Sequence, residues 1–157
     1  MNQYYALIGD IIESRSLANR ARMQEALSQA LNGLNERYQG HLASCFSLTL
    51  GDEFQGLLKV GAPIFQMIDE LRLALSEFVR SSWIQSQMET FRTILDLGYY
   101  QSRFDQKRVA TALGLSSSAF AKRMKSSGIK LYLDVKNDLN QAIENLARQA
   151  AQGGEGA

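Results

Sequence analysis

The sequence predicts an α+β protein in which a small sheet with two helices precedes an all-helical region. Two short apolar runs end in Gly-Asp pairs, at positions 9–10 and 51–52. A helical periodicity separates these runs and returns after the second one. The charge then changes sign, because residues 1–79 carry nine acids and six bases whereas residues 101–130 carry seven bases and one acid. This split indicates two units with different partners.

The composition limits the classes of protein to which the chain can belong. The chain has 157 residues, 45% of them apolar and 21% charged, which suits one ordinary domain or two small ones. No apolar run approaches the roughly 18 residues of a membrane span, and no basic stretch precedes an apolar core at the start. The single cysteine, Cys45, excludes an internal disulfide, and with the single histidine, His41, it is too little for a zinc cluster. We expect a soluble cytoplasmic protein without a membrane partner.

The first region reads as strand, helix, strand and return strand. Residues 4–8 form a short apolar run that predicts a buried strand. Apolar positions spaced i, i+3, i+4 and i+7 predict a helix over residues 17–38, with Gly40 as its C-cap. Alternation predicts a strand over residues 43–50, and the second Gly-Asp pair indicates a tight hairpin to a return strand over residues 54–58.

The sequence after this region predicts a series of helices. Pro63 suits the first turn of a helix over residues 63–79. Further helices are expected over residues 85–96, 106–113, 117–126 and 130–150. Alternation of Leu131 and Leu133 leaves a short strand over residues 129–133 open. The expected organisation is therefore a palm-like α+β domain over residues 1–80, a helix-turn-helix-like domain over residues 81–150 and a disordered tail over residues 151–157.

Residues 107–124 resemble a helix-turn-helix, and each marker has a mechanical reason. Ala110 is small where two helices must approach closely, and Gly114 permits the positive φ of the turn. The hydroxyl of Ser116 is placed to cap the second helix. Phe120 and Met124, spaced i and i+4, would pack that helix back onto the first.

This arrangement leaves polar and basic side chains outside and predicts DNA binding. The candidate DNA-binding residues are Ser117, Ser118, Lys122, Arg123 and Lys125. Residues near the start of a recognition helix reach base edges, while basic residues further along meet phosphates. One copy makes few phosphate contacts, so useful affinity predicts a homodimer. The alternative is a helical hairpin that binds nothing.

The two Gly-Asp pairs form a second candidate site. Asp10 and Asp52 would come close together at one end of the sheet, where two carboxylates repel unless a cation lies between them. Mg²⁺ or Mn²⁺ favours such ligands together with substrate phosphates, and Arg15 is placed to bind a phosphate. Spacing alone equally allows ordinary turn residues, with Asp10 capping backbone amides and Glu53 as an exposed edge charge.

Two sequence strings resemble the SatD family. They are ALIGDIIESR at residues 6–15 and LTLGDEFQGLL at residues 48–58. Residues between the strings that also fit the pattern are Arg20, Gln24, Leu34, Asn35 and Tyr38. The C-terminal helix-turn-helix looks like the one that ends those proteins, so the resemblance spans about residues 4–60 and 83–135. It implies an architecture more than an activity.

The N-terminal part of this family is similar, more remotely, to the palm of class III nucleotide cyclases and GGDEF domains. That resemblance implies a ferredoxin-like sheet in which metal-binding aspartates follow the first strand and lie at the hairpin. It carries over to Asp10 and Asp52, with Glu53 as a third metal ligand and a nucleotide as the partner. The chain departs from the pattern because no fourth strand follows residues 63–79. Either the sheet is shortened, or a partner chain completes it.

These observations favour a DNA-binding regulatory protein of the SatD family over an enzyme. Its palm-like domain would bind a metal or nucleotide, or dimerise. The alternatives are a metal-dependent, cyclase-like enzyme that processes nucleotides, and a non-catalytic scaffold in which both motifs are structural. The sequence assigns no catalytic residue, since nothing in it reads a nucleotide base or supplies a transition-state lysine as a cyclase would require.

Overall fold

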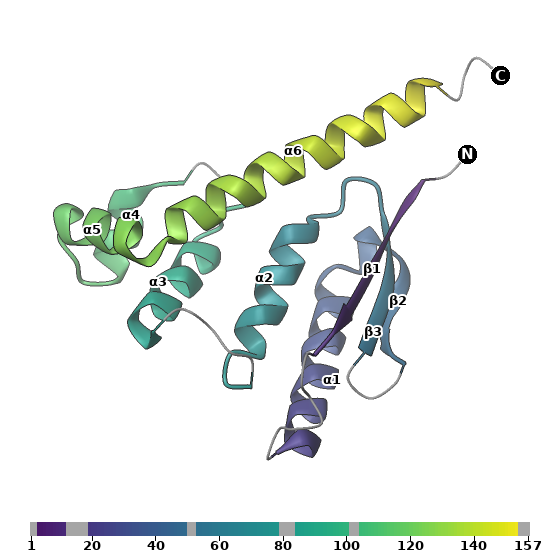
Figure 1. Cartoon of the computed structure of the whole chain (residues 1–157), viewed down its shortest axis with the longest axis horizontal. Helices are drawn as coiled ribbons and strands as arrows, with labels where there is room; N and C mark the ends of the chain where they lie inside the picture. The colour runs from purple at the N-terminus through teal and green to yellow at the C-terminus, as the bar shows by residue number, and fades with distance from the viewer. Residues whose placement is uncertain (1–2, 12–18, 50–52, 79–83, 101–103, 154–157) are drawn as a thin grey trace. The chain divides into compact units, whose positions relative to one another are not determined.

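A computed structural model describes most of the chain (Figure 1). The described residues are 3–11, 19–49, 53–78, 84–100 and 104–153. Internal contacts divide the chain into two compact units. We call residues 1–80 with 142–157 the sheet unit and residues 81–141 the helical unit.

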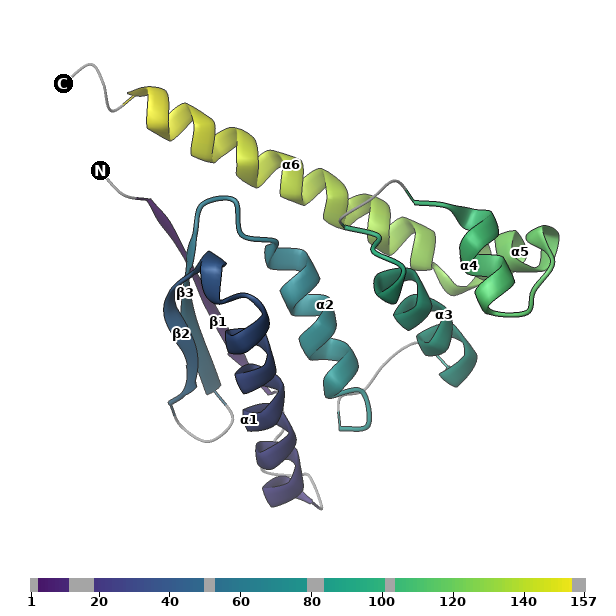
Figure 2. The ribbon, with the colours of Figure 1, turned by 180° about the vertical axis from the view of Figure 1, so that it is seen from behind.

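The sheet unit is a three-stranded antiparallel sheet with helices on one face. Its elements are β1 (Tyr4–Asp10), α1 (Arg20–Arg37), the short 3-10 helix η2 (Gln39–His41), β2 (Leu42–Leu48), β3 (Glu53–Lys59) and α2 (Ile64–Ala74). The strand order is β1-β3-β2, so the hairpin strand β3 lies in the middle. Helices α1 and α2 cover the same face of the sheet (Figure 2). The α+β architecture expected from the sequence is thereby confirmed.

One apolar core joins the three strands to the two helices. It contains Leu27, Leu31 and Leu34 of α1 with its C-cap Tyr38, Phe46, Phe54 and Leu58 of the strands, and Met67 and Leu71 of α2. The rings of Phe46 and Phe54 meet edge to face, with centroids 6.3 Å apart. The periodic apolar positions of the sequence therefore face this core, which is what an amphipathic helix against a sheet requires.

Strand β2 carries an irregularity that a side chain stabilises. Its pairing with β3 shifts register between Ser44 and Ser47. The amide of Asn35 donates to the carbonyl of Phe46 at 2.9 Å, and the N–H of Phe46 donates to Asn35 Oδ1 at 2.7 Å. Because a bulge leaves backbone groups without strand partners, Asn35 replaces the missing ladder bonds.

Some helix ends differ from the expected ones. Gly40 is not the C-cap of α1: the cap is Tyr38, and Gly40 lies inside η2. The N–H of His41 donates to Tyr38 O at 2.8 Å, which tightens the chain into a 3-10 turn. Helix α2 ends at Ala74 rather than at residue 79, because turn bonds such as Phe78 N–H to Leu75 O replace the α-helical ladder.

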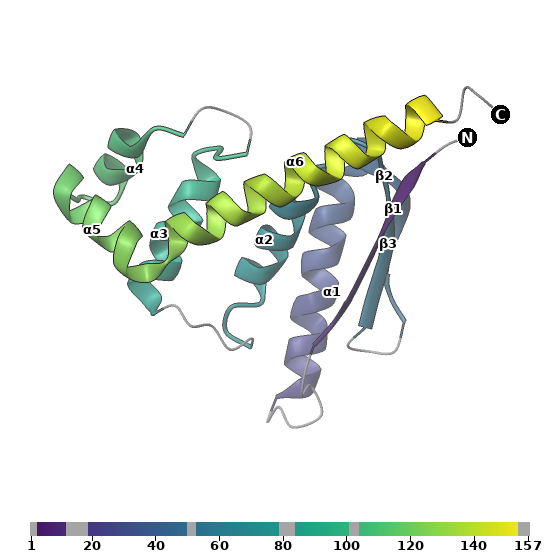
Figure 3. The ribbon, with the colours of Figure 1, turned by 45° about the horizontal axis from the view of Figure 1, so that its top comes forward.

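The helical unit holds α3 (Gln85–Asp96), α4 (Gln106–Ala112), α5 (Ser117–Ser127) and the first half of α6 (Ile129–Gly153), as Figure 3 shows. Residues 129–133 are helical, so the alternative of a short strand there is wrong. Buried apolar side chains of this unit are Phe91, Ile94, Val109, Ala110, Phe120, Met124, Ile129 and Leu133. The rings of Phe91 and Tyr132 pack edge to face, with centroids 5.5 Å apart, and tie α3 to α6.

Candidate nucleic-acid interface

Helix α4 begins and ends on specific capping groups. The Asp105 carboxylate accepts the N–H groups of Lys107 at 2.9 Å and Arg108 at 3.3 Å, which satisfies donors that a helix start leaves open. At the other end, Gly114 has φ +65°. The N–H of Leu115 donates to the carbonyl of Ala110 at 2.9 Å. This pattern is a Schellman motif, which ends the helix and starts the turn.

Helix α5 starts at once after this turn. Its N-cap, Ser116, accepts the N–H of Ala119 at 3.2 Å through its side-chain oxygen. Its C-cap, Gly128, has φ +70°, a conformation that favours glycine. The positive φ at Gly114 and the cap at Ser116 confirm the turn chemistry that the sequence predicted. Residues 106–127 are therefore two helices joined by a sharp turn.

The two helices pack as a helix-turn-helix requires. Helix α4 contacts both α3 and α5. The small Ala110 is buried on α4, while Phe120 and Met124 are 1% and 7% exposed on α5. Residues four apart lie on one helix face, so Phe120 and Met124 turn the opposite face of α5 outward.

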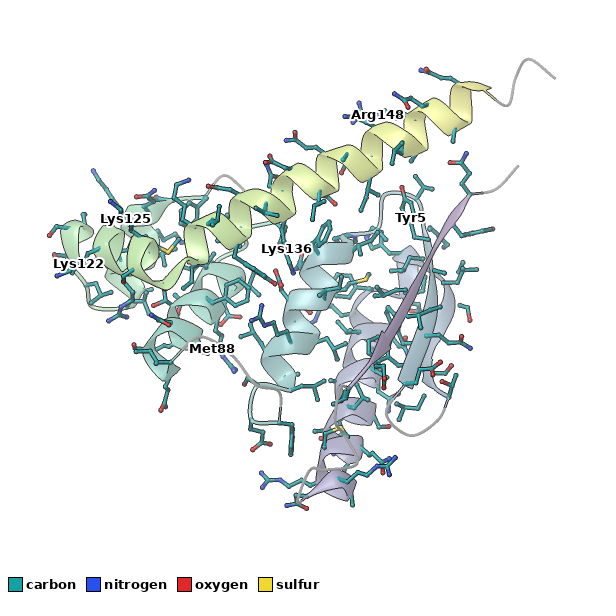
Figure 4. All side chains as sticks on the ribbon, viewed as in Figure 1. Tyr5, Met88, Lys122, Lys125, Lys136 and Arg148 are labelled. Atoms are coloured by element: carbon teal, nitrogen blue, oxygen red, sulfur yellow. The ribbon has the colours of Figure 1, made fainter. Side chains whose placement is uncertain are left out.

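The outward face of α5 carries four of the five candidate DNA-binding residues. Ser117, Ser118, Lys122 and Lys125 are all exposed. Ser118, Lys122 and Lys125 form a row at i, i+4 and i+7, and both lysine side chains project from the helix (Figure 4). We call these three residues the outer row. Short side chains at its start and cations further along suit contact with base edges and phosphates, respectively.

Arg123 is arranged differently from the other four candidates. It is half-buried, and its guanidinium donates to Thr90 Oγ1 on α3 at 3.2 Å. The Thr90 hydroxyl in turn donates to the carbonyl of Ser86 at 2.8 Å. This chain of hydrogen bonds gives Arg123 a structural role that joins α5 to α3. Spacing within α5 alone could not reveal it, because Thr90 lies 33 residues away.

Cations surround the helix-turn-helix. Among the described residues, the exposed ones on and beside α4 and α5 are Lys107, Arg108, Lys122, Lys125 and Lys130, of which Lys130 is paired with Asp134. The Asp105 carboxylate is directed at backbone N–H groups of α4, where it complements the positive end of the helix. The surface around α4 and α5 is therefore positive, as binding to a phosphate backbone requires.

The second candidate site lies at one end of the sheet. The register of β1 and β3 places Asp10 directly opposite Glu53. Directly opposed residues of an antiparallel pair have Cβ atoms about 5 Å apart, so the two carboxylates are neighbours. Asp52 and Arg15 lie outside the described residues. Within the part of the chain that is described, no group of three or more His, Cys, Asp or Glu side chains could hold a metal ion.

Gly9 and Gly56, which lie in the two matching strings, have a packing role that periodicity did not reveal. A Cβ at Gly9 would lie 2.3 Å from Phe54 Cζ, and one at Gly56 would lie 2.4 Å from Phe46 Cδ1. Each glycine therefore makes room for an aromatic ring of the neighbouring strand. Packing in the core of the sheet unit therefore explains why a glycine stands at position 9, in the first Gly-Asp pair.

Glu70 is a further polar centre that the sequence analysis did not single out. Its carboxylate accepts from Arg37 at 2.6 Å, from the Tyr38 hydroxyl at 2.6 Å and from Gln66 at 3.1 Å. Burial and this carboxylate raise the pKa of Tyr38 well above its usual range. These contacts join the end of α1 to α2. No local motif marks them, because Arg37 and Glu70 lie 33 residues apart.

Comparison with known proteins gives one match. A family model described as the SatD family matches residues 4–78 and 73–143, which together include both Gly-Asp strings and the helix-turn-helix. No curated protein and no solved structure matches the chain significantly. Among the described residues, no helix is both long and apolar enough to cross a bilayer.

Proposed function

The chain belongs to the SatD family, and we propose that it is a DNA-binding regulatory protein that contacts DNA through α4 and α5. The observation that carries this proposal is the division of α5 into two faces. Phe120 and Met124 are buried, whereas the outer row of Ser118, Lys122 and Lys125 is exposed. A recognition helix needs this division, because one face must hold the fold while the other enters the major groove.

The start of α4 supports the same surface. Lys107 and Arg108 are exposed in its first turn. In a helix-turn-helix the first helix crosses the DNA backbone while the second lies in the groove. Lys107 and Arg108 are therefore suited to phosphates, which give affinity without reading sequence.

The proposed regulator acts as a homodimer. A single helix-turn-helix makes few phosphate contacts, and dimers bind two half-sites. Within the described part of the chain, β1 pairs with β3 alone, and residues 4–9 of this edge strand contain neither a charge nor a proline. Ile8 on β1 is 64% exposed. Edges of this kind pair with another strand unless they are protected, which supports completion of the sheet by a second copy.

A gel-shift experiment with fragments of the source genome at moderate salt tests DNA binding. We expect Lys122→Glu to weaken binding about tenfold and to make the salt dependence less steep, because it reverses a charge in the outer row. Arg92→Glu is the matched control, since Arg92 is an exposed cation on α3 of the same unit. Equal affinities for the two variants would contradict the assignment of α5.

A second candidate function is binding of Mg²⁺ or Mn²⁺, alone or with a nucleotide, by the sheet unit. The observation that favours it is the pairing of Asp10 with Glu53, because like charges directly opposite each other destabilise a sheet unless a cation compensates them. Asp52 would be the further ligand and Arg15 the phosphate-binding residue. Mn²⁺ should raise the thermal midpoint of the wild type but not that of Asp10→Asn. An equal shift in both proteins would remove this candidate.

A further inference from the structure

A hollow of about 690 Å³ opens in the helical unit and shares only Lys125 with the outer row of α5. It lies between the middle of α5, the start of α6 and the residues that flank α4 on its N-terminal side. Its volume is within the roughly 300–1,000 Å³ of sites that bind small molecules. All of its lining residues belong to the helical unit.

The walls of the hollow are apolar and partly aromatic. Tyr99 and Phe104 form one wall, with ring centroids 5.5 Å apart and planes inclined by 70°. Met124 and Leu133, which are 7% and 2% exposed, contribute apolar atoms from α5 and α6. Aromatic rings and a methionine sulfur interact well with the face and edge of another ring. The hollow therefore suits a planar aromatic body.

The charged groups at the hollow leave one positive charge uncompensated. Lys130 and Asp134 form an ion pair one helical turn apart, so their charges offset each other. Lys125 also lines the hollow and is exposed, and no carboxylate of the described residues pairs with it. A ligand with a single negative group would complete this arrangement.

Tyr99 adds a hydrogen-bond donor to the wall. Burial, followed by the charge of Asp134, raises the pKa of Tyr99 above its usual value. At neutral pH the hydroxyl is protonated, with or without this shift, and can donate to an oxygen of a bound anion. A few directed polar groups in an apolar setting are typical of small-molecule sites.

We propose that this hollow binds a small aromatic monoanion, such as an aromatic carboxylate or sulfonate, and that the bound anion lowers the affinity for DNA. The second part of this proposal, the lowered affinity for DNA, rests on the proposed function. Lys125 belongs both to the hollow and to the outer row, so an anion that engages it removes a cation from the DNA-contacting face. Competition for one charged side chain is enough to couple the two ligands.

Titration of the full chain with anilinonaphthalene sulfonate, a fluorescent aromatic anion, tests the site. Ala121 lines the hollow and Ala119 does not, although both are exposed alanines of α5. We expect Ala121→Phe to fill the hollow and to weaken saturable dye binding at least about tenfold, while Ala119→Phe leaves it unchanged. Dye binding to Ala121→Phe at the wild-type affinity would overturn the proposal.

A second pair of variants tests the charge without adding bulk. Lys125→Gln should weaken dye binding about threefold, the effect of losing one partly exposed ion pair. Lys122→Gln is the matched control and should bind the dye as the wild type does, because Lys122 does not line the hollow. If both variants bind the dye with wild-type affinity, Lys125 does not hold the anion and this part of the proposal is wrong.

The coupling to DNA is tested by repeating the gel shift at saturating dye. We expect the dye to weaken DNA binding by the wild type and to have no effect on DNA binding by Ala121→Phe. If the dye binds at the hollow but the chain binds no DNA fragment, the proposed function fails and the anion site stands. If the chain binds DNA with the same affinity with and without dye, the coupling is wrong.

Discussion

The sheet unit and the helical unit each carry a motif that contains glycine, but the glycines of the two motifs have different roles. In the helical unit, Gly114 takes φ +65° and turns the chain so that α5 exposes its outer row. In the sheet unit, Gly9 and Gly56 make room for Phe54 and Phe46. One glycine positions a surface, whereas the other two complete a core.

The two motifs therefore differ in how directly they point to a function. In the helix-turn-helix, the residues needed for folding are buried or capping, and the candidate DNA-binding residues, apart from Arg123, are exposed. In the Gly-Asp strings, close packing alone explains why glycine precedes Asp10. Among the described residues, the pairing of Asp10 with Glu53 is what remains to support a metal site. The helical unit therefore gives the stronger basis for a function.

The largest loss of stability is expected for a substitution that disturbs the packing of the sheet glycines. Gly56→Ala places a Cβ 2.4 Å from Phe46 Cδ1, so the ring must move, and we expect a loss of about 1–3 kcal/mol in the free energy of unfolding. Gly33→Ala is the matched control: it lies inside α1 with nothing within 4 Å of its Cβ, and it should stabilise by about 0.5–1 kcal/mol. Chemical denaturation measures both. A neutral Gly56→Ala would show that the ring is not tightly held.

An intermediate effect concerns the Tyr38–Glu70 hydrogen bond. Tyr38→Phe should cost about 1–2 kcal/mol at neutral pH, since it removes a donor from a carboxylate that accepts it at 2.6 Å. Because the pKa of Tyr38 is raised above 10.0, an unfolded chain loses this proton before the folded one. Its contribution to stability is complete below pH 10.0 and falls as pH rises further.

Thermal unfolding between neutral and alkaline pH measures this linkage. The wild type should lose stability more steeply above pH 10.0 than Tyr38→Phe does. Some alkaline loss should remain in the variant, because the pKa values of Tyr99 and Lys130 in the helical unit are also raised. Identical pH profiles for the two proteins would rule out a coupling between Tyr38 and Glu70.

The smallest loss of stability is expected for a substitution that removes the N-cap of α5. Ser116→Ala removes the acceptor for the Ala119 N–H and should cost about 1 kcal/mol. Ser117→Ala, one residue further on, removes an exposed hydroxyl that caps nothing and should change stability by less than about 0.5 kcal/mol. Denaturation curves compare the two variants. Equal losses would mean that Ser116 does not anchor the turn.

Local signals predicted the helical unit better than the sheet unit. The boundaries of α3, the positive φ of Gly114 and the cap at Ser116 depend on residues within four positions of one another. In the sheet unit the strands were also recognisable, but the end of α1 was not. Gly40 has no positive φ, because a 3-10 turn rather than a glycine cap leads into β2.

The element order, the split in charge and the two faces of α5 follow from local features of the sequence, since periodicity and capping act over one or two helical turns. Three contacts are visible only in the folded chain: Asn35 stabilises the bulge of β2, Arg123 reaches Thr90, and Gly56 lies against Phe46. These pairs meet because the chain folds back on itself. Contacts between residues distant in sequence follow from strand register and helix packing, which no local pattern encodes.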